Sequence, residues 1–170
     1  MNMPAGSVAM DGFKDAMSRL ASGVSLLTTL GDGGAPLGML ATAVSSVSAE
    51  PPTILICINR RASMYGDLTK CGVFCANFLG VIHQDLALRF SSSTARESRF
   101  RNDRWETLST GSPVLVNALA SLDCRLDRLV DIGTHCVIFG RVVDTKTDFN
   151  GDQSPLTHFN RAYGGWHPVR

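Results

Sequence analysis

The clearest structural signal in the chain is the alternation Leu122-Asp123-Cys124-Arg125-Leu126-Asp127, in which apolar and charged side chains take turns. Successive residues of a β-strand point to opposite faces, so the pattern predicts a strand with one apolar and one polar face. A turn at residues 131–134 leads into a second extended run at residues 135–144, where Val137, Phe139 and Val143 share a face. The two runs together predict an antiparallel hairpin.

Shorter strand signals precede this hairpin, and turns rich in glycine or proline separate them. They cover residues 24–30, 37–43, 53–58 and 73–79; the run at 53–58 is apolar throughout and predicts a strand covered on both faces. Helices are expected from Asp11, at residues 64–69 and around residues 82–90. Short strands with few short helices predict a mainly β protein built on a closed or nearly closed antiparallel barrel, and they disfavour a parallel α/β sheet.

The length of 170 residues predicts one domain, covering residues 11–170 after a flexible start at residues 1–10. An apolar fraction of 44% with 18% charged residues is typical of an ordinary globular protein. The formal net charge of +1 provides no long-range field that would attract nucleic acid or an anionic membrane, so we expect neither as a partner.

Three further features favour the cytoplasm. No apolar run approaches the roughly 18 to 20 residues of a membrane-spanning helix. Residues 1–8 lack the basic-then-apolar layout of a secretory signal. The cysteines are odd in number and lie in apolar segments, which is typical of reduced core thiols: Cys57, Cys71, Cys75, Cys124 and Cys136.

Motifs for common nucleotide and metal sites are missing from the sequence. No G-x-G-x-x-G follows a strand and no G-x-x-x-x-G-K-[ST] occurs, so neither a Rossmann site nor a P-loop is encoded. The four histidines show no H-x-x-x-H spacing, and nothing completes a ligand set around Cys71 and Cys75. We therefore expect no metal site.

Small and hydroxyl-bearing residues gather just before Pro51-Pro52. The run extends from Ala41 to Ser48 and contains Thr42, Ala43, Val44, Ser45 and Ser46. A flat ring could lie close to such a backbone while hydroxyl and N–H groups bond its polar edge. The alternative is a strand end that runs into a polar loop.

Two basic segments could bind a phosphate. The first follows the most apolar strand and supplies charge and forked donors at a strand-to-helix junction: Asn59-Arg60-Arg61-Ala62-Ser63. A solvated surface turn would have the same composition. The second runs from Phe90 through Ser91 and Ser92 to Arg96 and continues to Arg99-Phe100. Its alternative is a mobile loop.

Aromatic side chains offer two more candidates. His135 opens a strand beside the apolar Val137 and Phe139, and it is either a ligand contact or a hydrogen-bonded residue at the barrel rim. Tyr163 and Trp166, near the end of the chain, form either a lid over a cofactor or a packed tail.

Taken in order, these segments resemble the short-chain flavin reductase family, and the resemblance spans residues 13–163. It rests on Ala21-Ser22-Gly23-Val24, Thr28-Thr29, residues 41–52, Cys57-Ile58-Asn59-Arg60, Cys75-Ala76-Asn77-Phe78-Leu79, Arg99-Phe100, Trp105 and Gly133-Thr134-His135. Within the family, the chain is most similar to the reductase components of two-component flavin monooxygenases.

This resemblance implies a fold and a reaction. The fold is an antiparallel Greek-key split β-barrel, the FMN-binding split barrel, usually as a homodimer with flavin near the subunit interface. The reaction is the reduction of FMN or FAD by NADH or NADPH, and the reduced flavin then diffuses to a partner oxygenase.

The resemblance also assigns residues by matching position. It places Thr42, Ala43, Val44, Ser45 and Ser46 beside the isoalloxazine ring, and Asn59, Arg60, Arg61 and Ser63 at the phosphate. Phe90, Ser91 and Ser92 would close over the flavin, Asn77 and Arg99 would be further contacts, and His135 and Tyr163 would lie where the nicotinamide stacks. Two positions depart from the family: Leu40 stands where relatives often have threonine, and the tail around Gly164-Gly165-Trp166 differs.

Hydride transfer from nicotinamide to flavin requires alignment rather than a protein acid or base. We therefore expect His135 to position the nicotinamide without transferring a proton. Two other functions remain open for the same barrel: a non-enzymatic flavin carrier or sensor, and an oxidase that holds its flavin tightly. The residues do not choose between FMN and FAD, or between NADH and NADPH.

Overall fold

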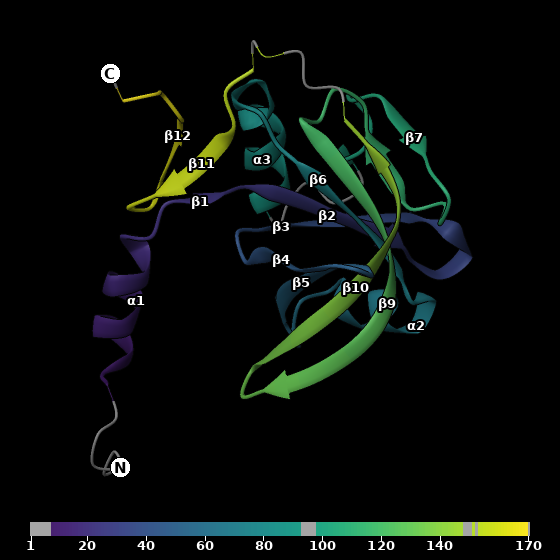
Figure 1. Cartoon of the computed structure of the whole chain (residues 1–170), viewed down its shortest axis with the longest axis horizontal. Coiled ribbons are helices and arrows are strands. Elements are labelled where there is room, and N and C mark those ends of the chain that lie inside the picture. Colours follow the sequence, from purple (N-terminus) through teal and green to yellow (C-terminus); the bar gives the residue numbers. More distant parts are fainter. Residues whose placement is uncertain (1–7, 93–97, 148–150, 152, 170) are drawn as a thin grey trace.

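The computed structural model describes residues 8–92, 98–147, 151 and 153–169. Strands dominate it, as predicted, and the helices are few and short (Figure 1). The helices are α1 (Met10–Ser18), α2 (Tyr65–Cys71) and α3 (Gln84–Ser91), with 3₁₀ turns η1 (Asp32–Gly34) and η2 (Val81–His83). The strands are β1 (Ser22–Gly23), β2 (Ser25–Leu30), β3 (Pro36–Ala41), β4 (Val44–Ala49), β5 (Pro52–Asn59), β6 (Val73–Phe78), β7 (Trp105–Thr107), β8 (Pro113–Leu115), β9 (Ala120–Ile132), β10 (His135–Lys146), β11 (Leu156–Phe159) and β12 (Ala162–Gly165).

A seven-stranded antiparallel sheet forms the body, in the order β3-β2-β6-β9-β10-β5-β4. Its two edge strands, β3 and β4, are consecutive in the chain and only Thr42 and Ala43 lie between them. Three Cα steps separate Ala41 from Val44, so the two edges meet within about 11 Å. The sheet must therefore curl until its edges are adjacent, and the seam between β3 and β4 stays open. This is the nearly closed antiparallel barrel that the strand pattern predicted, in the split form that the family resemblance implied.

The hairpin predicted from residues 122–144 is the longest in the molecule, and its strands β9 and β10 turn at Gly133, where φ is +56°. Register shifts occur between Phe139 and Gly140 and between Val142 and Asp144, and such irregularities bend a sheet toward closure. Gly140 faces the barrel interior, where an added Cβ would lie 2.4 Å from Cζ of Phe74. Close approach of that ring therefore requires glycine here.

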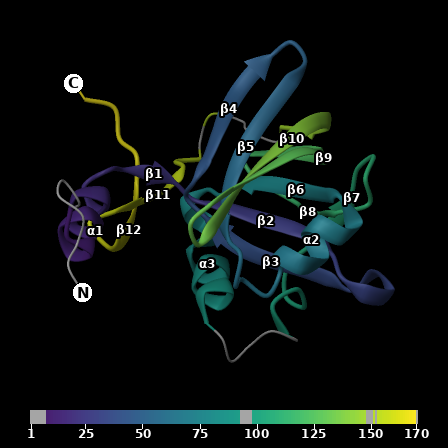
Figure 2. The ribbon, with the colours of Figure 1, turned by 90° about the horizontal axis from the view of Figure 1, so that it is seen from below.

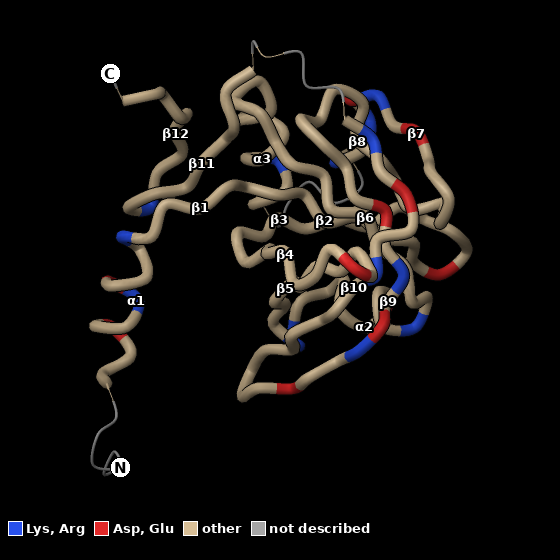
Figure 3. The backbone as a smooth tube through the Cα atoms, in the orientation of Figure 1, with Lys and Arg blue, Asp and Glu red and all other residues tan. Residues whose placement is uncertain are grey.

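One polar residue of the alternating run does not face solvent. Asp123 is fully buried on β9, where it accepts hydrogen bonds from the Thr110 amide at 2.7 Å and from the Thr110 hydroxyl. The segment before β8 covers this part of the strand, so the predicted polar face is interrupted. Elsewhere Lys and Arg are interspersed with Asp and Glu along β7 to β10 (Figure 3).

The apolar residues form two cores on opposite sides of the sheet. The barrel interior holds Ile54, Ile56 and Ile58 of β5 together with Phe74 and Ile138. The second core lies under α3 and contains Leu26, Leu79, Leu86, Phe90 and Leu156 among others. β2 and β6 lie between the two cores and are buried on both faces. The prediction that β5 is covered on both faces was wrong, because Leu55 and Cys57 on its outer face are only half-buried.

Helix α1 stands away from the barrel (Figures 1 and 2). None of its residues is buried, and the predicted apolar stripe is exposed: Phe13 at 60%, Met17 at 48% and, just beyond the helix, Leu20 at 59%. A small sheet of β1, β11 and β12 connects this region to the barrel. Within the described part of the chain, no helix is both long enough and apolar enough to span a membrane.

Candidate active site

The seam of the barrel carries the small and hydroxyl-bearing residues. Thr42 and Ala43 link β3 to β4 and are exposed, as are Ser45 and Ser46 at the start of β4, while Val44 is half-buried. The seam segment, defined as residues 42–46, is anchored on one side because the Cys57 amide donates to the Ala43 carbonyl at 3.1 Å and Val44 pairs with Ile56. Its other side faces an open cleft.

This cleft has a volume of about 770 Å³, which is within the range of roughly 300 to 1,000 Å³ typical of small-molecule sites. All five residues of the seam segment line it. The rest of the wall is mostly apolar and comes from residues 20–25, Ile54, Leu55, Phe78, Leu79, Leu119, Leu122, Pro155 and Leu156. Lining positions such as Leu119 and Leu122 look like ordinary core positions in the sequence, so no pattern singled them out.

The phosphate-binding candidate at residues 59–63 is a tight turn between β5 and α2. The Asn59 side-chain oxygen accepts the Arg61 amide at 2.9 Å, and the Asn59 carbonyl accepts the Ala62 amide at 2.8 Å. Ser63 is exposed and lines a second cavity of about 230 Å³, together with Arg99, Asp67 and Phe100. Ser63 and Arg99, 36 positions apart in sequence, thus supply a hydroxyl and a cation to one cavity.

The two predicted segments are neighbours, but they do not line the same space. Residues 42–46 are joined to β5 through the hydrogen bond between Cys57 and Ala43, two positions before Asn59. The seam segment lines the large cleft and Ser63 lines the smaller cavity, whereas Asn59, Arg60 and Arg61 line neither. We expected residues 42–46 and residues 59–63 to face each other across a single pocket. In the structure they are neighbours along the sheet, but they do not share a pocket.

Arg60 is engaged with the β9–β10 hairpin. Its guanidinium donates to a carboxylate oxygen of Asp131 at 3.1 Å and to the Gly133 carbonyl at 2.8 Å. Its backbone amide donates to the Thr134 carbonyl at 3.0 Å. These contacts turn the side chain toward the hairpin end and away from both cavities.

The two residues expected at the nicotinamide lie apart in a single chain. His135 is exposed at the start of β10, opposite Asn59, and its Nδ1 hydrogen-bonds the Thr134 hydroxyl at 2.9 Å. Tyr163 is on β12, where its hydroxyl hydrogen-bonds Ser91 at 3.3 Å. Figure 1 separates β12, at the upper left, from the turn between β9 and β10, at the bottom. One protomer therefore does not bring them to one site.

The residues expected to cover the flavin are partly packed inside. Phe90 is 5% exposed in the core under α3 and meets Phe100 edge-to-face, with ring centroids 5.3 Å apart. The Phe90 ring is therefore packed in the core of this chain, and its contact with a flavin stays a prediction. Ser91 is exposed, and the Ser92 carbonyl accepts a hydrogen bond from Arg99, whose guanidinium lies 5.5 Å from the Phe90 ring centre. Residues 93–97 of the predicted loop, Arg96 included, lie outside the described residues.

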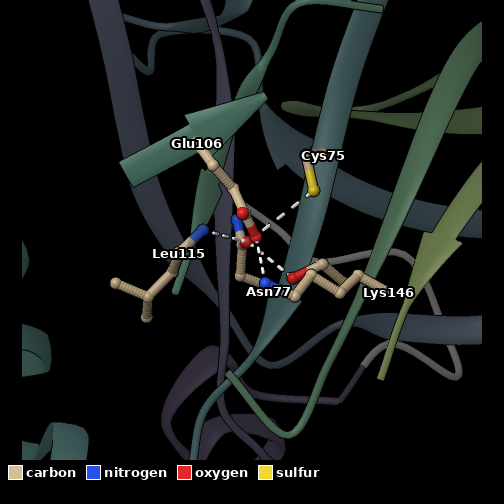
Figure 4. Close-up of polar contacts among 6 residues, drawn as sticks. Cys75, Asn77, Glu106, Leu115 and Lys146 are labelled. Carbon is tan, nitrogen blue, oxygen red and sulfur yellow. Dashed lines mark hydrogen bonds and ion pairs between the residues drawn. The ribbon is translucent and has the colours of Figure 1, made fainter. Parts of the chain in front are cut away.

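Asn77 is also not available to a ligand (Figure 4). It is 0% exposed, and its amide nitrogen donates to the Leu26 carbonyl at 3.1 Å and to the Thr28 hydroxyl at 3.2 Å. Its oxygen accepts the Leu115 amide at 2.8 Å and the Ser121 hydroxyl at 2.9 Å. Both ends of the amide are satisfied by β2, β8 and β9, so the predicted cofactor contact is instead a structural cross-link.

Titratable groups in the interior are structural as well. Burial raises the pKa of the Cys124 thiol to about 12 and raises that of Cys75 further, so neither thiol ionises near neutral pH. All five cysteines are free. Within the residues that the structure describes, no group of three or more histidine, cysteine or acidic side chains is placed to hold a metal.

Comparison with known proteins agrees with this architecture. A family described as Flavin reductase like domain matches residues 17–167. The chain is 43% identical over 161 residues to "FMN reductase (NADH) RutF" of Pseudomonas syringae pv. syringae (strain B728a), covering 95% of this chain and 89% of the relative. Its structure resembles nitrilotriacetate monooxygenase component B from Mycobacterium thermoresistibile, with a TM-score of 0.87, 26% identity and coverage of 94% of this chain and 90% of the other.

A third relative is BorF, the flavin reductase component of a bacterial two-component tryptophan halogenase. It superposes with a TM-score of 0.83 at 29% identity and covers 95% of this chain and 100% of its own. The family match extends over most of the chain, and the relatives agree with it in both sequence and structure. The chain therefore belongs to the flavin reductase family.

Proposed function

We propose that this chain is an NADH-dependent FMN reductase that releases reduced flavin to an oxygenase partner. The observation that carries the proposal is the open seam, where exposed hydroxyl-bearing residues line a cleft of suitable size. Membership of the flavin reductase family supports it, as does the name of a relative that reduces FMN with NADH. Structural relatives that serve a monooxygenase and a halogenase support the oxygenase partner.

The seam segment suits a flat heterocycle. Thr42, Ala43 and Ser45 are small and exposed, so a ring can approach the backbone closely, and the apolar wall of the cleft can cover its faces. Hydroxyl and backbone N–H groups can then bond the ring's polar edge. Donors in that position would stabilise the negative charge that develops near N1 and C2=O on reduction.

The phosphate end of FMN suits the smaller cavity, where Ser63 offers a hydroxyl and Arg99 a guanidinium. The chemistry at the site is hydride transfer from nicotinamide C4 to flavin N5, which the two cofactors supply themselves. The chain's own contribution is alignment. We assign His135 to the nicotinamide because it is exposed at the end of β10, beside the strand that anchors the seam segment.

We further propose that the active form is a homodimer. A contiguous exposed apolar stripe such as that of Phe13, Met17 and Leu20 is typical of a protein interface. A second copy is the occupant because each copy presents the same stripe, and two such stripes can pack against each other about a two-fold axis. Light scattering should give twice the chain mass, and Phe13→Glu with Met17→Glu should halve it. A wild-type monomer at assay concentration would refute the dimer.

The cytoplasm is the proposed location, because five free thiols suit a reducing compartment. We also propose that residues 11–170 act as a single domain.

Anaerobic NADH oxidation tests the activity. The purified chain should consume NADH only when FMN is added, with matching loss of flavin absorbance. A carrier or sensor would bind FMN without consuming NADH, which would contradict the proposal. An oxidase would keep its yellow colour through dialysis, and in air it would turn over its own substrate without added flavin, with O2 as the electron acceptor.

A further inference from the structure

The hairpin that carries His135 is held at its turn by Arg60. This arginine follows β5 directly and makes three hydrogen bonds to the turn, to the Asp131 carboxylate, the Gly133 carbonyl and the Thr134 carbonyl. Two of them come from the planar guanidinium fork, which fixes both distance and direction. Arg60 therefore connects the end of β5 to the residues immediately before His135.

This end of the hairpin has little buried surface. Residues 127–135 are all exposed. Gly133 has a left-handed backbone conformation and, because it has no side chain, adds no packing. His135 pairs with Ile132 and with Asn59 at the very end of their strands. A strand end with little buried surface opens more easily than the barrel centre. The hydrogen bonds of Arg60 should therefore decide how often this turn opens, without affecting the rest of the barrel.

We propose that Arg60 is a positioning residue for nicotinamide binding, which acts by holding the turn of residues 131–134 and thereby His135, and that it is not a phosphate ligand. The inference rests on the proposed role of His135. Sequence context alone suggested the phosphate role. The geometry reverses it, because the guanidinium is bonded to the hairpin and lines neither cavity.

Asp131→Asn separates the two roles most sharply. It removes the charge that holds Arg60 and leaves the guanidinium free to turn toward a phosphate. The positioning role predicts that Asp131→Asn raises KM for NADH by about twofold to threefold and leaves the Kd for FMN unchanged. A phosphate role predicts an unchanged KM for NADH and equal or tighter FMN binding.

Arg60→Ala and His135→Ala complete the test as a double-mutant cycle. We expect His135→Ala to raise KM for NADH about fivefold to tenfold and Arg60→Ala about threefold, with kcat reduced less than twofold in each. In the His135→Ala background, adding Arg60→Ala should raise KM by less than about 1.5-fold, because the residue acts through His135. Arg60→Lys, which keeps the charge toward Asp131 but loses the fork, should recover part of the effect.

A matched control lies on the same hairpin. Arg141 of β10 forms an ion pair with Asp127 of β9 at 3.4 Å, and these side chains are 52% and 48% exposed, against 45% and 56% for Arg60 and Asp131. Arg141→Ala removes an equally exposed pair that does not touch the turn, and it should leave KM for NADH within about 1.5-fold of wild type.

Amide hydrogen exchange provides a readout that does not depend on activity. Exchange at residues 132–135 should become faster in Arg60→Ala and Asp131→Asn and stay at the wild-type rate in Arg141→Ala. Unchanged exchange, additive effects in the cycle, or a rise in the FMN Kd alone would overturn the positioning role. If His135→Ala does not change KM for NADH, the assignment of His135 to the nicotinamide in the proposed function fails instead. Hydrogen exchange still reports whether Arg60 holds the turn, so the two failures can be distinguished.

Discussion

The seam segment and the buried cluster around Asn77 both contain small polar residues, but the first is exposed and the second is buried. Both carry side-chain hydroxyl groups near the barrel sheet, and the family resemblance implied that the seam segment and Asn77 contact the flavin. Around Asn77 every hydrogen-bonding group is paired within the protein, and the side chain is 0% exposed. At the seam, Thr42, Ser45 and Ser46 are exposed and line a cleft. Polar groups that the fold has already satisfied hold structure, and those left open can recognise a ligand.

The largest effect that tests this comparison is on stability. Asn77→Leu keeps the approximate size of the side chain but leaves the Leu115 amide and the Ser121 hydroxyl buried without the acceptor that Asn77 provides. We expect a loss of about 3–5 kcal/mol in the free energy of unfolding, measured with urea, because each buried orphan group costs roughly 1–3 kcal/mol. As a control, Ser46→Ala at the seam should cost less than about 0.5 kcal/mol. If Asn77→Leu were as stable as wild type but bound FMN more weakly, Asn77 would be a ligand contact and not a structural residue.

An intermediate effect is expected at the seam itself. Ala43→Phe fills the cleft at an exposed position, so the Kd for FMN should rise at least about tenfold while the free energy of unfolding changes by less than about 0.5 kcal/mol. Fluorescence titration and urea unfolding measure the two quantities. Val47→Phe places the same side chain on β4 outside the cleft lining and should change the Kd by less than about twofold. Equal effects of both substitutions would argue against a ligand at the seam.

The smallest effect concerns Asp123, whose burial raises the pKa of its carboxyl although Thr110 donates two hydrogen bonds to it. A folded-state pKa above the unfolded value means that the native state binds the proton more tightly. This contribution to stability is complete below about pH 4 and is lost as the pH rises through the folded-state pKa. Between pH 4 and 7 the free energy of unfolding should therefore fall more in wild type than in Asp123→Asn. Urea unfolding at several pH values measures the difference, and parallel pH profiles would contradict the assignment.

Side-chain periodicity was sufficient to predict most of the fold. The alternation at residues 122–127 marked β9, and apolar runs marked β2, β5 and β6, because burial on a pleated strand leaves a direct trace in the sequence. β4 left no such trace, since its edge position exposes nearly every residue and removes the need for an apolar face. Closure of the barrel was predicted from the short strands and the few helices, but the two-residue link that brings its edges together could not be recognised without β4.

The site was harder to predict than the fold because residue type does not reveal direction. Thr42 and Ser46 line the cleft, whereas Asn77 and Phe90 face the interior and Arg60 faces the hairpin. A polar side chain in sequence can bond either a ligand or a distant strand, and only the three-dimensional partner decides between these. Asp67, which lines the smaller cavity beside Ser63, was missed because a single acidic residue in a short helix carries no distinguishing pattern.

A crystal structure of the chain with FMN bound would show where the flavin lies. We expect the flavin ring against residues 42–46 in the cleft at the barrel seam, with the side chain of Asn77 unmoved in the interior. Flavin bound elsewhere, with the seam cleft filled by protein side chains, would contradict this expectation.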